Sequence, residues 1–260
     1  MKTIDDFAKI NFRKALSSSE AFTLQFINPF VYNNFHLAFD KLNDVQKSGS
    51  IKLLDVGCGE QPYRSLIEKI GFKYVGMDVA ARNVKLDVVA PIDDKNLLCD
   101  NRRGNIYDVI VLTEVLEHVD NHEQAWLNLS GLCREGGFII ITAPFIYPLH
   151  EQPWDACRPT IYQLSRNAER HGFKVETAIR AGGVSDVVGL LFSTIHKPTR
   201  EANLISRFLG YIAWACLRII SKILLKFKFL DFMKSEYYVT NLFVCRKMET
   251  VSPLNDQVPG

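Results

Sequence analysis

One segment of the chain concentrates side chains that can bind anions or accept protons. Residues 143–160 read APFIYPLHEQPWDACRPT and include His150, Glu151, Asp155 and Arg158. An imidazole or a carboxylate can take a proton from a hydroxyl or an amine, and a guanidinium can hold an anionic group. Because several prolines stiffen the segment, we take these four residues as catalytic candidates, with His150 as the first candidate base. In the alternative reading, Asp155 and Arg158 pair only to hold the loop in shape.

A glycine-rich turn at Gly57-Cys58-Gly59 indicates a second kind of site. An apolar run over 51–56 leads into the turn, and glycines there let a backbone approach a ligand closely. About 20 residues later a second apolar run ends in Asp78, the position of an acid that binds ribose hydroxyls. A dinucleotide motif needs a third glycine where this chain has Pro62. The pattern therefore favours a nucleoside cofactor other than a nicotinamide, although a lone G-x-G also occurs in tight structural turns.

Short runs rich in Val and Ile alternate with intervals of helix length. This alternation predicts parallel strands with helices on both faces of the sheet. Thr160 is the expected N-cap of a helix over 161–171, which Gly172 closes. The expected strands are 51–56, 73–78, 84–89, 107–113, 136–142 and 173–179. In such a sheet the glycine turn, Asp78 and the 143–160 loop all follow strand ends on the binding side.

The order and spacing of four motifs resemble those of class I S-adenosylmethionine-dependent methyltransferases of the type 11 kind. LLDVGCGE resembles the first motif, YVGMD the second, YDVIVLTEVLEHV the fourth and GGFIIITAP the strand that follows. The resemblance implies an α/β fold, a Rossmann-like seven-stranded and mostly parallel sheet whose last strand, over 237–245, runs antiparallel. The 143–160 loop resembles a signature of type 11 relatives linked to surface-polysaccharide biosynthesis.

The same resemblance implies that S-adenosyl-L-methionine binds at the glycine turn. Asp55, Gly57 and Gly59 would lie by its methionine moiety, and Asp78 would hold its ribose. The adenine contact is open, because Ala90-Pro91 stand where the family has an Asp, and Asp93 is the candidate just beyond. The further residues expected to line the cofactor are Cys58, Val79, Thr113 and Glu114.

Glu114, Glu117 and His118 form an E-x-x-E-H pattern, and on one helical turn the three would face the same way. The spacing resembles a set of metal ligands that His150 could complete. Since LEHV is common in type 11 enzymes that use no metal, we expect no metal here. In that case Glu114 lines the cofactor pocket, while Glu117 and His118 cap or orient the next helix.

The regions outside the central motifs are assigned by composition. Residues 1–48 are rich in Phe and predict helices that break near Asn28-Pro29. These helices form a cap over the sheet or a lid over the cofactor. Residues 49–248 form the methyltransferase domain with a helical insertion over 182–235, and residues 249–260 are expected to be a disordered tail.

Within the insertion, residues 203–230 predict one basic amphipathic helix. Its longest uncharged run, 208–217, is shorter than the ~20 residues that a membrane span needs. We therefore expect peripheral contact with an anionic membrane through 203–230, or packing of the helix on the sheet. The apolar stripe is Ile205, Leu209, Ile212, Cys216, Ile220, Ile223, Phe227 and Leu230, and the basic stripe is Arg207, Arg218, Lys222 and Lys226.

Composition narrows the location and the partners. The net charge of +2 predicts no nucleic-acid partner. Six cysteines without a C-x-x-C pair suit a reducing compartment. Acidic residues near the N-terminus, where a signal peptide would be apolar, argue against export. We expect a cytoplasmic protein, at the inner face of the membrane if the 203–230 helix docks.

These observations predict methyl transfer from S-adenosylmethionine to a hydroxyl of a glycan or a lipid-linked intermediate. The first alternative is a small-molecule methyltransferase of quinone or secondary metabolism, with the Phe-rich N-terminal region supplying an apolar pocket. The second is a non-catalytic cofactor-binding module, against which the retained Asp55, Gly57, Gly59 and Asp78 argue. The oligomeric state is not specified by the sequence.

Overall fold

The computed structural model describes residues 18–45, 50–81, 83–99, 106–195, 203–228, 230–232 and 236–249. A seven-stranded sheet lies at its centre, in the order β3-β2-β1-β4-β5-β7-β6. The first five of these strands in spatial order pair in parallel, and β7 runs antiparallel between β5 and β6. The strands are β1 (Lys52–Val56), β2 (Lys73–Asp78), β3 (Val88–Val89), β4 (Tyr107–Thr113), β5 (Cys133–Pro144), β6 (Phe173–Ala181) and β7 (Thr240–Lys247). The expected Rossmann-like fold is confirmed.

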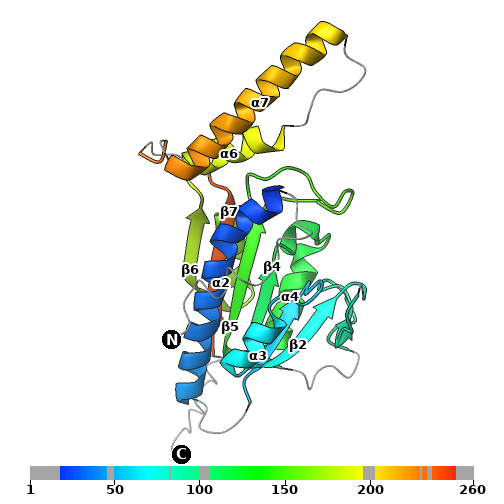
Figure 1. The fold of residues 1–260 in the computed structure, drawn as a ribbon. Coiled ribbons are helices and arrows are strands. Elements are labelled where there is room, and N and C mark those ends of the chain that lie inside the picture. Colours follow the sequence, from blue (N-terminus) through cyan, green and yellow to red (C-terminus); the bar gives the residue numbers. More distant parts are fainter. Residues whose placement is uncertain are drawn as a thin grey trace, which may run out of the picture.

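Strands at the centre of the sheet are buried on both faces because helices cover each side (Figure 1). Along β1, Leu53 packs toward one face and Leu54 toward the other, as the period of two in a strand requires. Only β3 is much shorter than expected, with two residues instead of 84–89. The Asp87 carboxylate accepts the Gly76 backbone N–H at 2.9 Å, so a side chain replaces a ladder bond at this edge.

Helix α2 (Ser18–Val45) covers one face together with α3 (Arg64–Ile70). The predicted break near Asn28-Pro29 is wrong, since Pro29 lies inside one continuous helix. Ile27, Phe30 and Val31 are buried against the sheet on both sides of the proline, and this packing outweighs its local penalty. The described part of α2 is thus a cover for the sheet, and residues 1–17 and 46–49 of the predicted cap lie outside the described residues.

The other face is covered by α4 (His122–Leu132) and α5 (Ile161–Arg170). The Thr160 side chain accepts the Gln163 N–H at 3.1 Å, which confirms the predicted N-cap. Helix α5 ends at Arg170, and Gly172 follows it with φ of +84°. The Asn121 side chain caps α4 by accepting the Gln124 N–H at 3.0 Å. Glu117 and His118 therefore do not cap this helix, so the first of the two roles expected for them is wrong, and the second, orienting the helix, stays a prediction.

The insertion between β6 and β7 is a pair of helices, α6 (Val184–Thr194) and α7 (Leu204–Phe227), beyond the carboxyl ends of the parallel strands (Figure 1). Helix α6 packs against Val239 and against Ile146 and Tyr147 of the loop after β5. Helix α7 packs on α6 through its carboxyl-terminal part, where Ser221 and Leu224 are buried. The expectation that the helix packs on the sheet is therefore wrong for the described structure.

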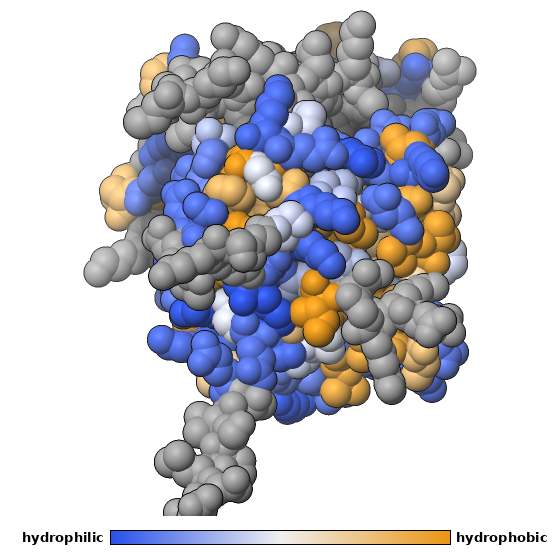
Figure 2. All heavy atoms as spheres, turned by 90° about the horizontal axis from the view of Figure 1, so that it is seen from below, coloured by the Kyte–Doolittle hydropathy of each residue, from blue (hydrophilic) through white to orange (hydrophobic). Residues whose placement is uncertain are grey.

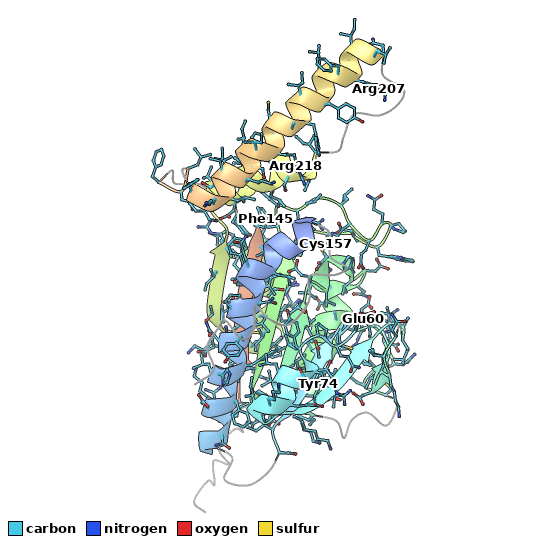
Figure 3. All side chains as sticks on the ribbon, in the orientation of Figure 1. Glu60, Tyr74, Phe145, Cys157, Arg207 and Arg218 are labelled. Atoms are coloured by element: carbon cyan, nitrogen blue, oxygen red, sulfur yellow. The ribbon has the colours of Figure 1, made fainter. Side chains whose placement is uncertain are left out.

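The rest of α7 projects from the domain with its apolar side chains exposed (Figure 3). Arg207 lies near its far end, whereas Arg218 turns back to donate to the Ser193 carbonyl of α6. Arg218 is therefore not part of a solvated basic stripe. The exposed apolar residues of α7 are Leu204, Ile205, Phe208, Leu209, Tyr211, Ile212, Ile219, Ile220, Ile223 and Phe227.

By length and composition α7 is the one described helix that is apolar enough to cross a membrane. Its most apolar window of 18 residues has a mean hydropathy of 1.7, and 6% of that window is buried. The longest uncharged run, 208–217, does not reflect this composition, because Arg207 and Arg218 interrupt the apolar sequence. A helix lying flat in a membrane interface shares this composition, so flat docking stays a prediction.

The opposite end of the molecule, seen from below, carries hydrophilic residues interspersed with separate hydrophobic groups (Figure 2).

Candidate active site

The glycine turn after β1 has one crowded glycine and one open one. Gly57 and Gly59 have φ of +66° and +51°, a region that side chains disfavour. A Cβ on Gly57 would lie 2.5 Å from Val115 Cγ2, whereas no described atom beyond its two chain neighbours lies within 4 Å of a Cβ placed on Gly59. The backbone at Gly59 therefore borders free space, as the cradle of a ligand does.

Asp78 ends β2 and shapes the same turn. Its Oδ2 accepts the Gly59 N–H at 2.8 Å and its Oδ1 accepts the Val79 N–H at 2.7 Å. The acid predicted to bind a ribose thus lies beside the open glycine, with two backbone bonds that fix its position. Val79 itself is exposed.

Asp55 is a buried acid next to the turn, with 1% of its surface exposed. Its Oδ2 accepts the Tyr74 hydroxyl at 2.8 Å, while Oδ1 has no hydrogen-bond partner in the described structure. Burial raises the pKa of Asp55 to about 7, against the lowering effect of the Tyr74 bond. Burial also raises the pKa of the neighbouring Cys58 thiol to about 12, so this cysteine is no thiolate nucleophile.

Thr113 and Glu114 stand at the carboxyl end of β4. Glu114 has φ of +54°, and its Oε1 accepts the Thr142 hydroxyl of β5 at 2.9 Å. Burial raises the pKa of Glu114 to about 7. Asp93 has a different position, because its Oδ2 accepts the Asn121 N–H at 3.0 Å and so holds the start of α4. Its predicted contact with adenine stays a prediction.

The loop after β5 is held by an ion pair between Asp155 and Arg158. Arg158 donates to both oxygens of the Asp155 carboxylate, and its guanidinium also reaches the carbonyl of Cys157. Burial acts to raise the pKa of Asp155, but the bonds from Arg158 and the His150 N–H lower it to about 2. Asp155 is therefore an ionised carboxylate whose two oxygens both pair with Arg158. This pairing supports the alternative reading in which the two residues hold the loop in shape. Glu151 is exposed in the same loop, with φ of +46°.

His150 meets Glu117 and His118 in a compact cluster. Nε2 of each histidine lies 3.8 Å from Glu117 Oε1, and the three ligand atoms lie within 4.8 Å of one another. Glu117 has no exposed surface, and neither of its oxygens has a hydrogen-bond partner in the described structure. Burial, together with the nearby Glu114, raises the pKa of Glu117 well above its usual value.

The structure groups these residues differently from the sequence pattern. The three residues Glu114, Glu117 and His118 do not share a helical turn, because only Leu116–His118 is helical, as a short 3-10 helix. Glu114 lies outside the cluster and bonds to β5. The sequence did not predict the hydrogen bond from Tyr74 to Asp55, because the residues of a strand do not show which acid a tyrosine among them will contact.

A methyltransferase-domain family model matches residues 30–178, which is more than half of the chain. The mitochondrial ubiquinone biosynthesis O-methyltransferase of Rattus norvegicus is 28% identical over 126 residues, covering 44% of this chain and 36% of that protein. The ubiquinone biosynthesis O-methyltransferase of Rickettsia felis is 26% identical over 152 residues, covering 54% and 60%. The chain thus spans less than two thirds of the length of these relatives. A solved S-adenosylmethionine-dependent methyltransferase from Archaeoglobus fulgidus is 14% identical, covering 89% and 100%, with a TM-score of 0.48.

The chain belongs to this family of methyltransferases, for which the sequence predicts S-adenosylmethionine as the cofactor. The residues present fit that cofactor on two structural observations. No described atom beyond its chain neighbours lies within 4 Å of a Cβ placed on Gly59, and Asp55, near the carboxyl end of β1, has a buried carboxylate oxygen without a hydrogen-bond partner in the described structure. Membership of a methyltransferase family supports an enzyme over a non-catalytic cofactor-binding module.

Proposed function

We propose that the protein methylates a hydroxyl oxygen of a lipid-soluble acceptor resembling a quinone precursor, and that it works at a membrane surface. The observation that carries the proposal is the position of α7, whose exposed apolar side chains rise from the same edge of the sheet as the glycine turn and the 143–160 loop. The similarity to ubiquinone biosynthesis O-methyltransferases supports a quinone-type acceptor over the glycan expected from the loop signature.

In this proposal the cofactor supplies a methyl group carried on a sulfonium. Asp55, Gly57, Gly59 and Asp78 hold it at the carboxyl ends of β1 and β2, with Cys58, Val79, Thr113 and Glu114 as further lining residues. These residues meet around one turn, where close backbone approach and fixed carboxylates favour a polar ligand of this size. The role of each stays a proposal that binding measurements on single variants test.

The acceptor hydroxyl must lose a proton, and we infer that the cluster of Glu117, His118 and His150 promotes that loss. Asp155 Oδ2 lies 3.1 Å from Nδ1 of His150, which leaves Nε2 facing the interior of the cluster. A carboxylate behind an imidazole orients the ring and favours a free electron pair on its other nitrogen. Asp155 and Arg158 act as positioning residues, and the exposed Glu151 takes no part in the step.

Helix α7 supplies the membrane contact in the proposal. Leu204, Ile205 and Phe208 are at least 65% exposed, and such side chains gain free energy when they enter the interface of a bilayer. Lys222 and Lys226 are exposed on the same helix. Each basic residue near an anionic bilayer contributes about 1 kcal/mol. The helix would thus bring the edge of the sheet that holds the site to an acceptor dissolved in lipid.

The test is sedimentation with vesicles, followed by methyl transfer to quinone-type catechols with and without a long isoprenoid tail. We expect binding to anionic vesicles that weakens in high salt, and faster turnover of the tailed acceptor on those vesicles. Replacing Leu204, Ile205 and Phe208 by Ser should release the protein without unfolding it. A matched control replaces the exposed Lys69 and Lys95 by Glu, which should leave partitioning unchanged.

Two results would contradict the proposal. If the wild type fails to pellet with anionic vesicles at low salt, α7 does not dock on bilayers. If catechol acceptors are not methylated while hydroxyls of surface glycans are, the acceptor class is the glycan that the loop signature indicates. The two assays are read separately, so each part of the proposal stands or fails by itself.

A further inference from the structure

The cluster of Glu117, His118 and His150 has the ligand set of a metal centre. Two imidazole nitrogens and one carboxylate oxygen lie within 4.8 Å of one another. Such a set of two histidines and one carboxylate, with further positions open, is typical of catalytic zinc and of other divalent transition metals. It is less suited to magnesium, which prefers oxygen ligands.

Each histidine of the cluster has an oxygen close to its other ring nitrogen. Nδ1 of His118 is 3.2 Å from the Trp154 carbonyl oxygen, in a hydrogen bond, and Nδ1 of His150 is 3.1 Å from Asp155 Oδ2, in a close contact without hydrogen-bond geometry. Histidines that bind metals almost always offer their other nitrogen to a carbonyl or a carboxylate in this way, because the contact fixes the ring and the electron pair of the ligating nitrogen. Both Nε2 atoms consequently face Glu117.

Glu117 gives an independent reason to expect a cation. Its carboxylate is fully buried, and neither oxygen has a hydrogen-bond partner among the residues that the structure describes. A buried carboxylate without a partner must either carry a proton or neutralise a cation. The nearby guanidinium of Arg158 is already engaged by both oxygens of Asp155, so it does not resolve the charge of Glu117.

Two of the three distances between the ligand atoms are near those of an occupied site, and the third is no longer than 4.8 Å. Bonds of about 2.1 Å in a tetrahedral site place neighbouring ligand atoms about 3.4 Å apart. The two distances from Glu117 Oε1 to the histidine nitrogens are 3.8 Å. Small rotations of the side chains would close the difference. His118 and His150 are each about one fifth exposed, so an ion and a ligand in an open coordination position have a path to the site.

We propose that Glu117, His118 and His150 bind one divalent transition-metal ion, in contrast to the metal-free site expected from the sequence. The ion leaves coordination positions open beside the loop after β5. Where the proposed function holds, an acceptor hydroxyl that entered such a position would have its pKa lowered by the ion, and its proton would pass to solvent. His150 would then serve as a ligand, and not as the base. Metal binding itself depends on no acceptor and is tested directly.

The experiment uses the full chain without a histidine tag, stripped with chelator and dialysed against Zn²⁺ or Co²⁺. We expect one ion per chain by elemental analysis, and visible absorption from Co²⁺ that reports nitrogen and oxygen ligands. Replacing a residue that supports a metal ligand typically weakens metal binding by roughly 10–100-fold. The variants His118→Ala and His150→Ala each remove a ligand itself, so each should weaken metal binding by more than that. The control His36→Ala removes an imidazole of α2, outside the cluster, and should bind as the wild type does.

Thermal unfolding without metal shows whether each variant is folded, and Glu117→Gln serves as a third variant that keeps the volume of the side chain. A wild type that takes up no ion after metal loading would overturn the proposal and indicate a protonated Glu117. Equal binding by the wild type and by folded His118→Ala and His150→Ala variants would also overturn it, because the ion would lie elsewhere. Neither result bears on methyl transfer, which is assayed separately.

Discussion

Replacing Gly59 by Ala tests whether the glycine turn binds the cofactor or is only a tight structural turn. The new Cβ would point into space that no described atom occupies within 4 Å, so the variant should fold. Its cost to the folded state is that of a side chain at φ of +51°, about 1–2 kcal/mol. If the cofactor fills that space, the same methyl group displaces it, and binding should fall much further than stability does.

The matched variant is Gly57→Ala, two residues earlier in the same turn. Its Cβ would lie 2.5 Å from Val115 Cγ2, so it carries the same backbone strain and a steric overlap with the protein as well. We expect Gly57→Ala to lower the free energy of unfolding by more than Gly59→Ala does. A bulkier change at Gly57 would therefore test the fold along with the site, which makes Gly59 the better probe.

The assay is calorimetric titration with S-adenosylmethionine or its demethylated product, alongside urea unfolding of each variant. The wild type should bind in the micromolar range, near −8 kcal/mol. Gly59→Ala should bind at least tenfold more weakly, which corresponds to about 1.4 kcal/mol. Wild-type affinity in a folded Gly59→Ala variant would refute the reasoning, because the open space would then not be the cradle.

Two further predictions concern the acids beside the turn. Asp78→Asn should weaken cofactor binding by about 1.5–3 kcal/mol, because a charge-assisted bond is lost, and unchanged affinity in the same titration would move the ribose contact elsewhere. For Asp55, the folded pKa of about 7 lies above the unfolded value of 3.8, so the stability it contributes is present at low pH and is lost as pH rises between these values. Over that window the wild type should lose up to about 4 kcal/mol more than Asp55→Asn does, and parallel stability curves from urea unfolding of the two proteins would contradict the burial argument.

The sequence predicts the central strands well because burial on both faces leaves a strong signal. The runs that end at Val56, Asp78 and Thr113 are mostly apolar, and their ends in the structure are those expected. The break at Pro29 was wrong because a local rule competes with packing that only the folded chain reveals. Ile27 and Val31 hold the helix on the sheet from both sides of the proline.

The candidate site was predicted in its parts but not in its grouping. The glycine turn and Asp78 meet because both follow strands of known order, which the spacing already implies. Whether His150 reaches Glu117 depends on the path of the loop after β5, and the pair of Asp155 and Arg158 fixes that path. No periodic pattern in the sequence predicts the path of such a loop. The sequence likewise gives no indication of the left-handed backbone at Glu114.

The short segment from Thr113 to His118 serves two parts of the site at once. Val115 fills the space against Gly57, Glu114 ties the segment to Thr142, and Glu117 and His118 stand in the cluster. Substitutions here would disturb the cofactor turn and the reacting centre together. The two helices of the insertion carry no such double duty, whereas the loop after β5 brings His150 to the cluster. An engineer who wishes to change the range of acceptors should therefore diversify α6 and α7 and leave 113–118 and His150 untouched.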